Sequence, residues 1–335
     1  MPLRFELDQP AGANIARMLG EQIRKADRAL GDPSDLTASV HKGRKALKRS
    51  RGVLRLAKPG LAKADFKRLN WALRDCGRVL SDARDTAILN GALTALACHA
   101  DIGRSSAVRE LKWLIADLAP CEESIDGEAE AVAGARMLLK RVQPLVDDLE
   151  PDFIERDDII SGYFASYADG RAKFEAISSE DDDEAHHDLR KAAQYHWRQS
   201  AMLSPIHPSV MQIRVETARR VSQLLGADHD LSILIAFIRR EGPAVCTKQQ
   251  RKRLIAAARD RQRGLRKLFA APAQRLYALP PAALAEAVDA YWTAAERERD
   301  LASHFPDDLR DDIDHTQSET GLDPARGTRG VDPSC

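Results

Sequence analysis

Apolar residues recur every three or four positions along nearly the whole chain of 335 residues, and this spacing constrains the fold most strongly. Such a period matches the 3.6 residues of a helical turn, whereas a half-buried strand alternates apolar and polar residues. We find no alternating run that would force a strand and no hairpin signal. Helices are expected over residues 14–30, 34–56, 62–95, 105–118 and 128–150, and the same spacing continues beyond them. The sequence therefore predicts an all-α protein.

The composition agrees with a helical fold. Charged residues make up 30% of the chain and aromatic residues only 5%, whereas strands favour aromatic and β-branched side chains. No run of about 18 apolar residues is found, and the first stretch, MPLRFELDQPAG, has acids and a proline where a signal peptide would be apolar. We therefore expect a cytoplasmic protein without a membrane span. The cysteines form no CxxC pair and are expected to be small buried side chains in a reducing compartment; they are Cys76, Cys98, Cys121, Cys246 and Cys335.

Two sequence patterns occur twice. The pattern HxxRKA at residues 41–46 returns at residues 187–192. Residues 80–89 (LSDARDTAIL) are matched by residues 225–234 (LGADHDLSIL), in the same order along the chain. The offsets are 146 and 145 residues, which agree to within one. We interpret the agreement as an internal duplication that gives two pseudo-symmetric, antiparallel helical bundles.

The expected organisation is a first helical half over residues 1–160, a second over 161–305 and a tail over 306–335. The whole chain is formally neutral, with 51 bases and 51 acids. The tail alone has eight acids, three arginines and few large apolar residues, and we expect it to be disordered. The two halves are therefore mildly basic.

The strongest local excess of positive charge is VHKGRKALKRSRGVLRLAK, residues 40–58, with eight Lys or Arg, one His and no acid. Solvated helices usually mix both signs, because like charges one turn apart repel by a few tenths of a kcal/mol. A bound polyanion would relieve this repulsion. A rotation of about 100° per residue around the helix axis puts six of the side chains on one arc of about 120°, and these are His41, Arg44, Lys45, Lys48, Arg51 and Arg55. The next expected helix repeats the arrangement with Lys67, Arg74, Arg78 and Asp85.

The run between Val40 and Lys58 contains no aromatic residue, and the chain has no RNP, KH or zinc-finger pattern. Charge without stacking side chains favours a ligand made of phosphate alone. The tryptophans are expected to anchor the core or the wall of a groove rather than to stack on bases; they are Trp71, Trp113, Trp197 and Trp292.

Three motifs together resemble the conserved histidine α-helical domain (CHAD) family. They are HxxRKxxKxxR at residues 41–51, RxxxRxLSxxRD at 74–85 and HxLRKxxxYHW at 187–197, and the resemblance extends over roughly residues 5–305. It implies one domain of long antiparallel helices in two pseudo-symmetric halves, with a basic groove that binds inorganic polyphosphate. Members of the family often lie beside or are fused to a triphosphate-tunnel enzyme domain, and some are found on polyphosphate granules. No ExExK pattern is present, so this chain resembles a stand-alone member.

The resemblance implies which residues bind polyphosphate. In the first half they are His41, Arg44, Lys45, Lys48, Arg51, Arg74, Arg78 and Arg84, and in the second half His187, Arg190, Lys191 and His229. The chain departs from the pattern at Gln194, where a base is expected, and at Arg198, where an aromatic is common. Candidates to compensate are Arg198, Arg219 and Arg220, while Asp85 and Asp230 are expected to orient arginines.

Other functions are weighed against non-catalytic binding. The two histidines that head the basic stripes, His41 and His187, are either pH-dependent phosphate ligands or structural groups. A metal site is not expected, because His186, His187 and His196 fit neither HExxH nor an i,i+4 pair. Metal-dependent hydrolysis of polyphosphate, or a regulatory role for such an enzyme, is the alternative; it needs carboxylates or a nucleophile that the basic run lacks. We expect no cofactor, a polyphosphate-metabolising enzyme as a further partner, and nucleic acid only as a weak competing polyanion.

Overall fold

The computed structural model is helical throughout the residues that it describes, which confirms the all-α prediction. These residues are 3–32, 34–80, 85–100, 103, 105–117, 122–149, 154–177 and 182–302. Within them the chain forms eleven α-helices and no strand. Several begin at a side-chain cap of the kind the sequence offers: Asp35 Oδ1 accepts from the backbone N–H of Ala38 and opens the second helix. The predicted tail, residues 306–335, lies outside the described residues.

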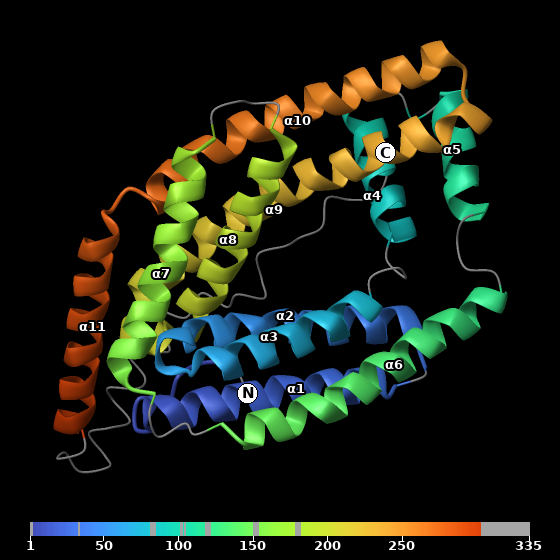
Figure 1. Ribbon diagram of the computed structural model, residues 1–335. Coiled ribbons are helices and arrows are strands. Elements are labelled where there is room, and N and C mark those ends of the chain that lie inside the picture. Colours follow the sequence, from blue (N-terminus) through green and yellow to red (C-terminus); the bar gives the residue numbers. More distant parts are fainter. Residues whose placement is uncertain are drawn as a thin grey trace.

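One layer of the molecule is formed by four of the first six helices, the three at the start of the chain and the sixth. They are α1 (Ala11–Leu30), α2 (Leu36–Leu56), α3 (Lys63–Val79) and α6 (Glu122–Asp147), at the bottom of Figure 1. Helix α1 packs on α2, and α6 covers α1 and α3. The approach of α1 to α2 is close, because a Cβ added to Gly43 would lie 2.8 Å from Leu30 Cδ2.

The second layer contains α7 (Arg156–Glu175), α8 (Asp183–Met202), α9 (Pro208–Arg240) and α10 (Lys248–Leu276). Helix α9 packs between α8 and α10, and α11 (Pro281–Ala302) lies against α7 at the edge of this layer. Short 3-10 turns with a proline in each join α8 to α9 and α9 to α10; they are Ser204–Ile206 and Gly242–Ala244.

The helix predicted over residues 62–95 is two helices. Helix α3 ends at Val79, and a separate helix, α4, spans Asp85–His99. Helix α4 packs on α9 and α10 of the second layer, so the chain must leave the first layer between α3 and α4. Helix α5 (Ser106–Asp117) follows it there, because Gln250 Nε2 donates to Ser106 Oγ over 3.1 Å.

The position of α4 and α5 against the second layer, which we call the excursion of the first half, is relevant to the predicted duplication. The first copy of the repeated segment, residues 80–89, lies at the break between α3 and α4, whereas its match at 225–234 lies inside the continuous helix α9. The other pair of matched segments lies on α2 and α8, which are both long helices. The duplication and the boundary at residue 160 therefore stay predictions.

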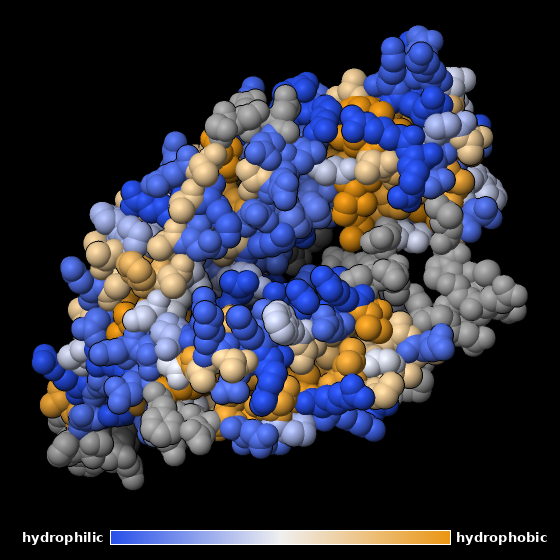
Figure 2. Space-filling model, viewed as in Figure 1, coloured by the Kyte–Doolittle hydropathy of each residue, from blue (hydrophilic) through white to orange (hydrophobic). Residues whose placement is uncertain are grey.

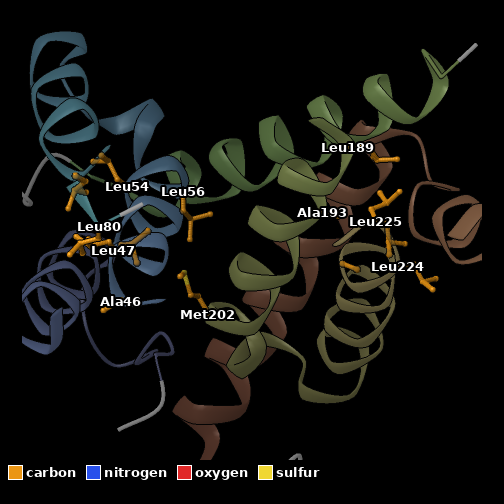
Figure 3. Packing of buried hydrophobic residues seen from close by; sticks show 14 of the residues in the cluster. Ala46, Leu47, Leu54, Leu56, Leu80, Leu189, Ala193, Met202, Leu224 and Leu225 are labelled. Atoms are coloured by element: carbon orange, nitrogen blue, oxygen red, sulfur yellow. The ribbon is translucent and has the colours of Figure 1, made fainter. Parts of the chain in front are cut away.

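One hydrophobic core joins the two layers. Figure 3 shows Leu54 and neighbouring residues on one side, Leu189 and Leu225 on the other, and Leu56 of α2 and Met202 of α8 between them. The two layers also touch through backbone. A Cβ added to Gly162 of α7 would lie 1.9 Å from the carbonyl oxygen of Leu56, so only glycine allows α7 this close to α2.

The structure corrects some expectations about individual side chains. Cys76 and Cys246 are buried as predicted, but Cys98 is exposed; Cys121 and Cys335 lie outside the described residues. Trp292 is buried and Trp197 half-buried, whereas Trp71 and Trp113 are 53% and 71% exposed. These two do not anchor the core, and the alternative that they form the wall of a groove stays a prediction. Both lie on helix faces that turn away from the core.

Helix α9 alone, among the helices that the structure describes, is long and apolar enough to span a membrane by length and composition. More than half of that stretch, 56%, is buried inside the protein, between α8 and α10. A core helix meets the same criteria.

Candidate functional site

Helix α2 turns its cations away from the core. Leu47 and Leu54 are buried on one side of the helix, while His41 and Lys45 are exposed and Lys48 is half-buried on the other. The sequence arranges this by placing apolar residues at one helical spacing and bases at the other. The predicted basic face is therefore accessible along most of α2.

Two arginines at the edge of this face also hold α2 to α3. The guanidinium of Arg44 donates to the carbonyl oxygen of Leu80, just beyond the C-terminus of α3, where backbone acceptors are left without partners in the helix. Arg51 Nε donates to Asn70 Oδ1 over 3.4 Å. Both side chains therefore have a structural role besides any contact with a ligand.

Helix α8 crosses α2 at Gly52. A Cβ added to this glycine would lie 3.8 Å from both Cβ and Cδ of Arg198, an ordinary van der Waals distance, so the arginine side chain packs beside α2 here. Gln199 Nε2 donates to the carbonyl oxygen of Gly52 over 3.4 Å. The guanidinium of Arg55 stacks on the ring of Tyr195 at 4.3 Å, which adds a cation–π contact between the two helices.

Beside this crossing, cations from four helices gather. We define the cation cluster as Lys25 of α1, Lys45 and Arg49 of α2, Arg198 of α8 and Arg219 of α9. Arg49, together with partial burial and then Lys25, Arg219 and Arg198, lowers the pKa of Lys45. Burial, followed by the charges of neighbours that include Arg49, lowers the pKa of Arg198 to about 10. No residue of the cluster has an ion pair with an acid in the described part of the chain, so their mutual repulsion is not offset there.

Two histidines extend the basic surface along α8 and α9. The rings of His187 and His229 stack with their centroids 4.0 Å apart. Burial and then Lys191 and Arg190 lower the pKa of His187. Burial and then His187, Arg190 and Lys191 lower the pKa of His229 to about 4. Both imidazoles are therefore neutral near pH 7, in surroundings where an added anion would favour the protonated form.

A buried network fixes the helices beneath these histidines. Arg266 of α10 and Asp228 of α9 are 3% and 2% exposed and form a two-point pair, with Nε–Oδ1 and Nη2–Oδ2 distances of 2.8 and 3.0 Å. Arg266 Nη2 also contacts Asp183 Oδ1 at 2.5 Å, and Arg259 contacts the same carboxylate at 2.9 Å. Gln262 Nε2 donates to the carbonyl oxygen of Asp228 over 3.0 Å. The network joins α8, α9 and α10, and it sets the position of His187 and His229.

The family model of the CHAD domain matches residues 14–239, about two thirds of the chain. The chain belongs to the CHAD domain family. A crystal structure of the CHAD domain from the plant Ricinus communis is similar in fold, with a TM-score of 0.61 and 18% sequence identity over 84% of this chain and 96% of that one. No curated protein matches the chain.

The CHAD fold brings many of the predicted residues together. The contacts above join Lys45, Arg55, Arg198 and Arg219 around the crossing of α2 and α8. They also join His187, Arg190, Lys191 and His229 between α8 and α9, where Arg190 Nε lies 3.7 Å from a Cβ placed on Gly226. At 100° per residue, His187, Lys191, Gln194 and Arg198 share one face of α8. The departure at Arg198 thus puts a charge beside the crossing of α2 and α8.

For other predicted residues, the described part of the chain shows no contact with these groups. Arg74 and Arg78 of α3 share Asp75, at 3.4 and 3.9 Å, in exposed ion pairs that contribute little. Arg220 is exposed but lies 100° further around α9 than Arg219, on another side of the helix. Arg84 lies outside the described residues.

Several residues that lie around the crossing of α2 and α8 and in the network beneath the histidines were not predicted from the sequence. Arg49 is part of the basic run but falls outside the arc drawn through His41, and nothing local links Lys25 of α1 to that run. Tyr195 belongs to the family motif and was not given a role. Asp228 holds the buried Arg266, and its helical spacing from the leucines of α9 was the signal available in the sequence. The orienting role expected of Asp230 stays a prediction.

We use the name trough for the space between α2, α8 and α9 that the cation cluster, His187 and His229 border. Figure 2 shows the molecule hollowed between its two layers, with mostly hydrophilic side chains around the hollow. Such a surface can hold a flexible anion through guanidinium forks and ammonium point charges.

The three histidines of α8 lie in different surroundings. His186 is buried against Phe269 and donates from Nδ1 to the carbonyl oxygen of Asp182 over 2.6 Å. His196 is buried beside Tyr163, and only His187 borders the trough. Across the described ranges no three His, Cys, Asp or Glu side chains lie close enough to hold a metal ion. The absence of a metal stays a prediction.

Proposed function

We propose that this CHAD domain binds inorganic polyphosphate in the trough and leaves it chemically unchanged. One feature carries the proposal: bases of α1, α2, α8 and α9 lie near one another beside the crossing at Gly52, where Arg49, then burial and the other bases, lower the pKa of Lys45. Maintaining such repulsion is unfavourable for the free protein, at a few tenths of a kcal/mol for each close pair. A chain with about one negative charge per phosphate would offset this repulsion by attraction to each of the bases.

The shape of the site supports a long, flexible anion rather than a small one. The basic face of α8 runs from His187 to Arg198, about 16 Å by the helical rise, and α2 continues it beyond Gly52 toward His41. The lysines and arginines of the cluster are hydrogen-bond donors only, with no acceptor for a proton. Binding through positioned charges, without proton transfer or a nucleophile, is what these side chains can do.

The cellular part of the proposal follows from the resemblance to the family. We expect the protein in the cytoplasm, associated with polyphosphate granules, with a polyphosphate-metabolising enzyme as a further partner. Colocalisation of a tagged protein with stained granules tests this part, and a diffuse signal in granule-containing cells would contradict it.

The binding test compares two double charge reversals. Lys45→Glu with Arg219→Glu changes the trough, whereas Lys252→Glu with Arg253→Glu makes the same charge change on exposed positions of α10. Titration with polyphosphates of several lengths at two salt concentrations should show a loss on the order of 100-fold or more for the first pair only. The affinity should also fall steeply with salt, by analogy with nucleic acids.

Equal losses of affinity in the two double variants would mean that binding depends on the overall charge of the protein, and would contradict binding in the trough. The non-catalytic part has its own test. Polyphosphate is incubated with the protein and Mg²⁺ or Mn²⁺, and the phosphate released is measured. A hydrolytic activity that copurifies with the protein would favour the hydrolytic alternative.

A further inference from the structure

The outer face of α3 combines an exposed indole with cations. Leu69, Leu73 and Cys76 form the buried side of this helix. Trp71 lies on nearly the opposite side and is 53% exposed. A large aromatic side chain in that position contributes little to the core, so its presence calls for another use.

The neighbours of Trp71 on the surface of α3 are bases. Lys67 precedes it by one turn, and Arg74 and Arg78 follow by one and two turns, all within an arc of about 60°. One carboxylate, Asp75, serves both arginines, and Lys67 has no ion pair among the described residues. The face around the indole is therefore positively charged overall.

Trp113 provides a contrast on the same protein. It is even more exposed, at 71%, but it lies on α5 between Arg109, Glu110 and Asp117, where both signs of charge are present. Arg109 pairs with Glu110 at 3.8 Å. An exposed tryptophan is thus not by itself a feature of a basic surface in this chain, and only Trp71 combines the two properties.

An indole between cations on an open helix face suits a ligand that carries both flat bases and phosphates. We propose that the outer face of α3 binds single-stranded nucleic acid, with one base stacked on Trp71 and phosphates on Lys67, Arg74 and Arg78. The face from Lys67 to Arg78 is about 16 Å long, which corresponds to roughly five stacked nucleotides. A duplex, whose bases are stacked on one another, cannot use the indole in this way.

This inference goes beyond polyphosphate binding in the trough and does not depend on it. Inorganic polyphosphate has no bases, so Trp71 should make no difference to its affinity. The two arginines of α3 are common to both sets of candidate residues, which means that the ligands can compete there. The indole separates them.

The test measures binding of labelled single-stranded RNA and DNA of roughly ten nucleotides, twice the length of the face, and of a matched abasic strand. Trp71→Ala should weaken binding of the base-containing strands by between about 5-fold and about 150-fold. Trp71→Phe, which keeps a smaller aromatic ring, should have an affinity between those of the unchanged protein and Trp71→Ala. Trp113→Ala should bind as tightly as the unchanged protein. Affinity for the abasic strand and for polyphosphate should not depend on Trp71.

Loss with either RNA or DNA supports the proposal, and the comparison shows whether the ribose hydroxyl contributes. The proposal is overturned if the unchanged protein does not bind the single strands, if Trp71→Ala binds them equally well, or if the abasic strand loses as much. The outcome is independent of the trough: a protein that binds oligonucleotides through Trp71 but does not bind polyphosphate would reject the proposed function and keep this inference. A protein that binds polyphosphate but does not bind oligonucleotides through Trp71 would keep the proposed function and reject this inference.

Discussion

The stacked histidines should make the proposed binding of polyphosphate depend on pH. In the free protein the pKa of His229 is lowered to about 4, from an ordinary 6.5, by burial and by His187 and the bases beside it. Phosphates in the trough would oppose those charges and return the pKa toward 6.5. The bound protein would then hold a proton that the free protein does not, so affinity should rise as the pH falls.

The size of the effect follows from these two values. Between about pH 7 and about pH 5, a site whose pKa moves from about 4 to about 6.5 on binding gains about 20-fold in affinity. His229 is partly exposed, and screening by solvent reduces the gain, so we expect between about 5-fold and about 20-fold. The pKa of His187 is lowered too, which acts in the same direction. The nearby carboxyls of Asp183 and Asp188 have lowered pKa values, so they stay charged throughout this range.

Isothermal titration with polyphosphate at the two pH values measures this gain. The variant with His187→Gln and His229→Gln should lose most of it, while His99→Gln, an exposed histidine on α4, should keep it. Thermal unfolding gives a second readout. A lowered pKa in the folded state stabilises the free protein above pH 6.5, and this contribution is lost as the pH falls toward 4, so polyphosphate should raise Tm more at the lower pH. Affinity that does not change with pH, or a gain that survives in the double variant, would refute the reasoning.

Two substitutions test the packing that supports the site. Asp228→Asn removes the buried charge that pairs with Arg266 and should lower the free energy of unfolding by about 3–5 kcal/mol in urea titrations, whereas Asp228→Leu with Arg266→Met should recover most of the loss. Gly162→Ala places a methyl group 1.9 Å from the carbonyl oxygen of Leu56 and should cost at least about 3 kcal/mol by the same measurement. Gly264→Ala, which meets nothing within 4 Å, should instead stabilise the protein by about 0.5–1 kcal/mol, and equal effects at the two glycines would contradict the packing argument.

Local patterns were sufficient to predict the helices and the exposed basic face of α2, because both depend on spacing within one element. The break between α3 and α4 was not predictable in this way. Residues 81–84 are Ser-Asp-Ala-Arg, with neither glycine nor proline to interrupt a helical pattern. What requires the break is the position of α9, more than a hundred residues later in the chain.

The same limit applies to the site. The meeting of Lys25, Lys45 and Arg219 depends on the angle at which α8 and α9 cross α2, which α8 contacts at Gly52. No sequence pattern records such a crossing. The exposure of Trp71 is different, since its place beside Lys67, Arg74 and Arg78 on a helical wheel was available from the sequence and was assigned to the core or a groove wall instead.

The excursion of α4 and α5 has a consequence for how the protein is made. These helices emerge early from the ribosome, but contacts such as that of Ala107 with Cys246 join residues 139 positions apart. Until α9 and α10 have been synthesised, the apolar side of α4 has nothing to cover it and is available for aggregation. Folding must therefore wait for long-range contacts, and a chain interrupted between the two halves should depend on chaperones or be degraded.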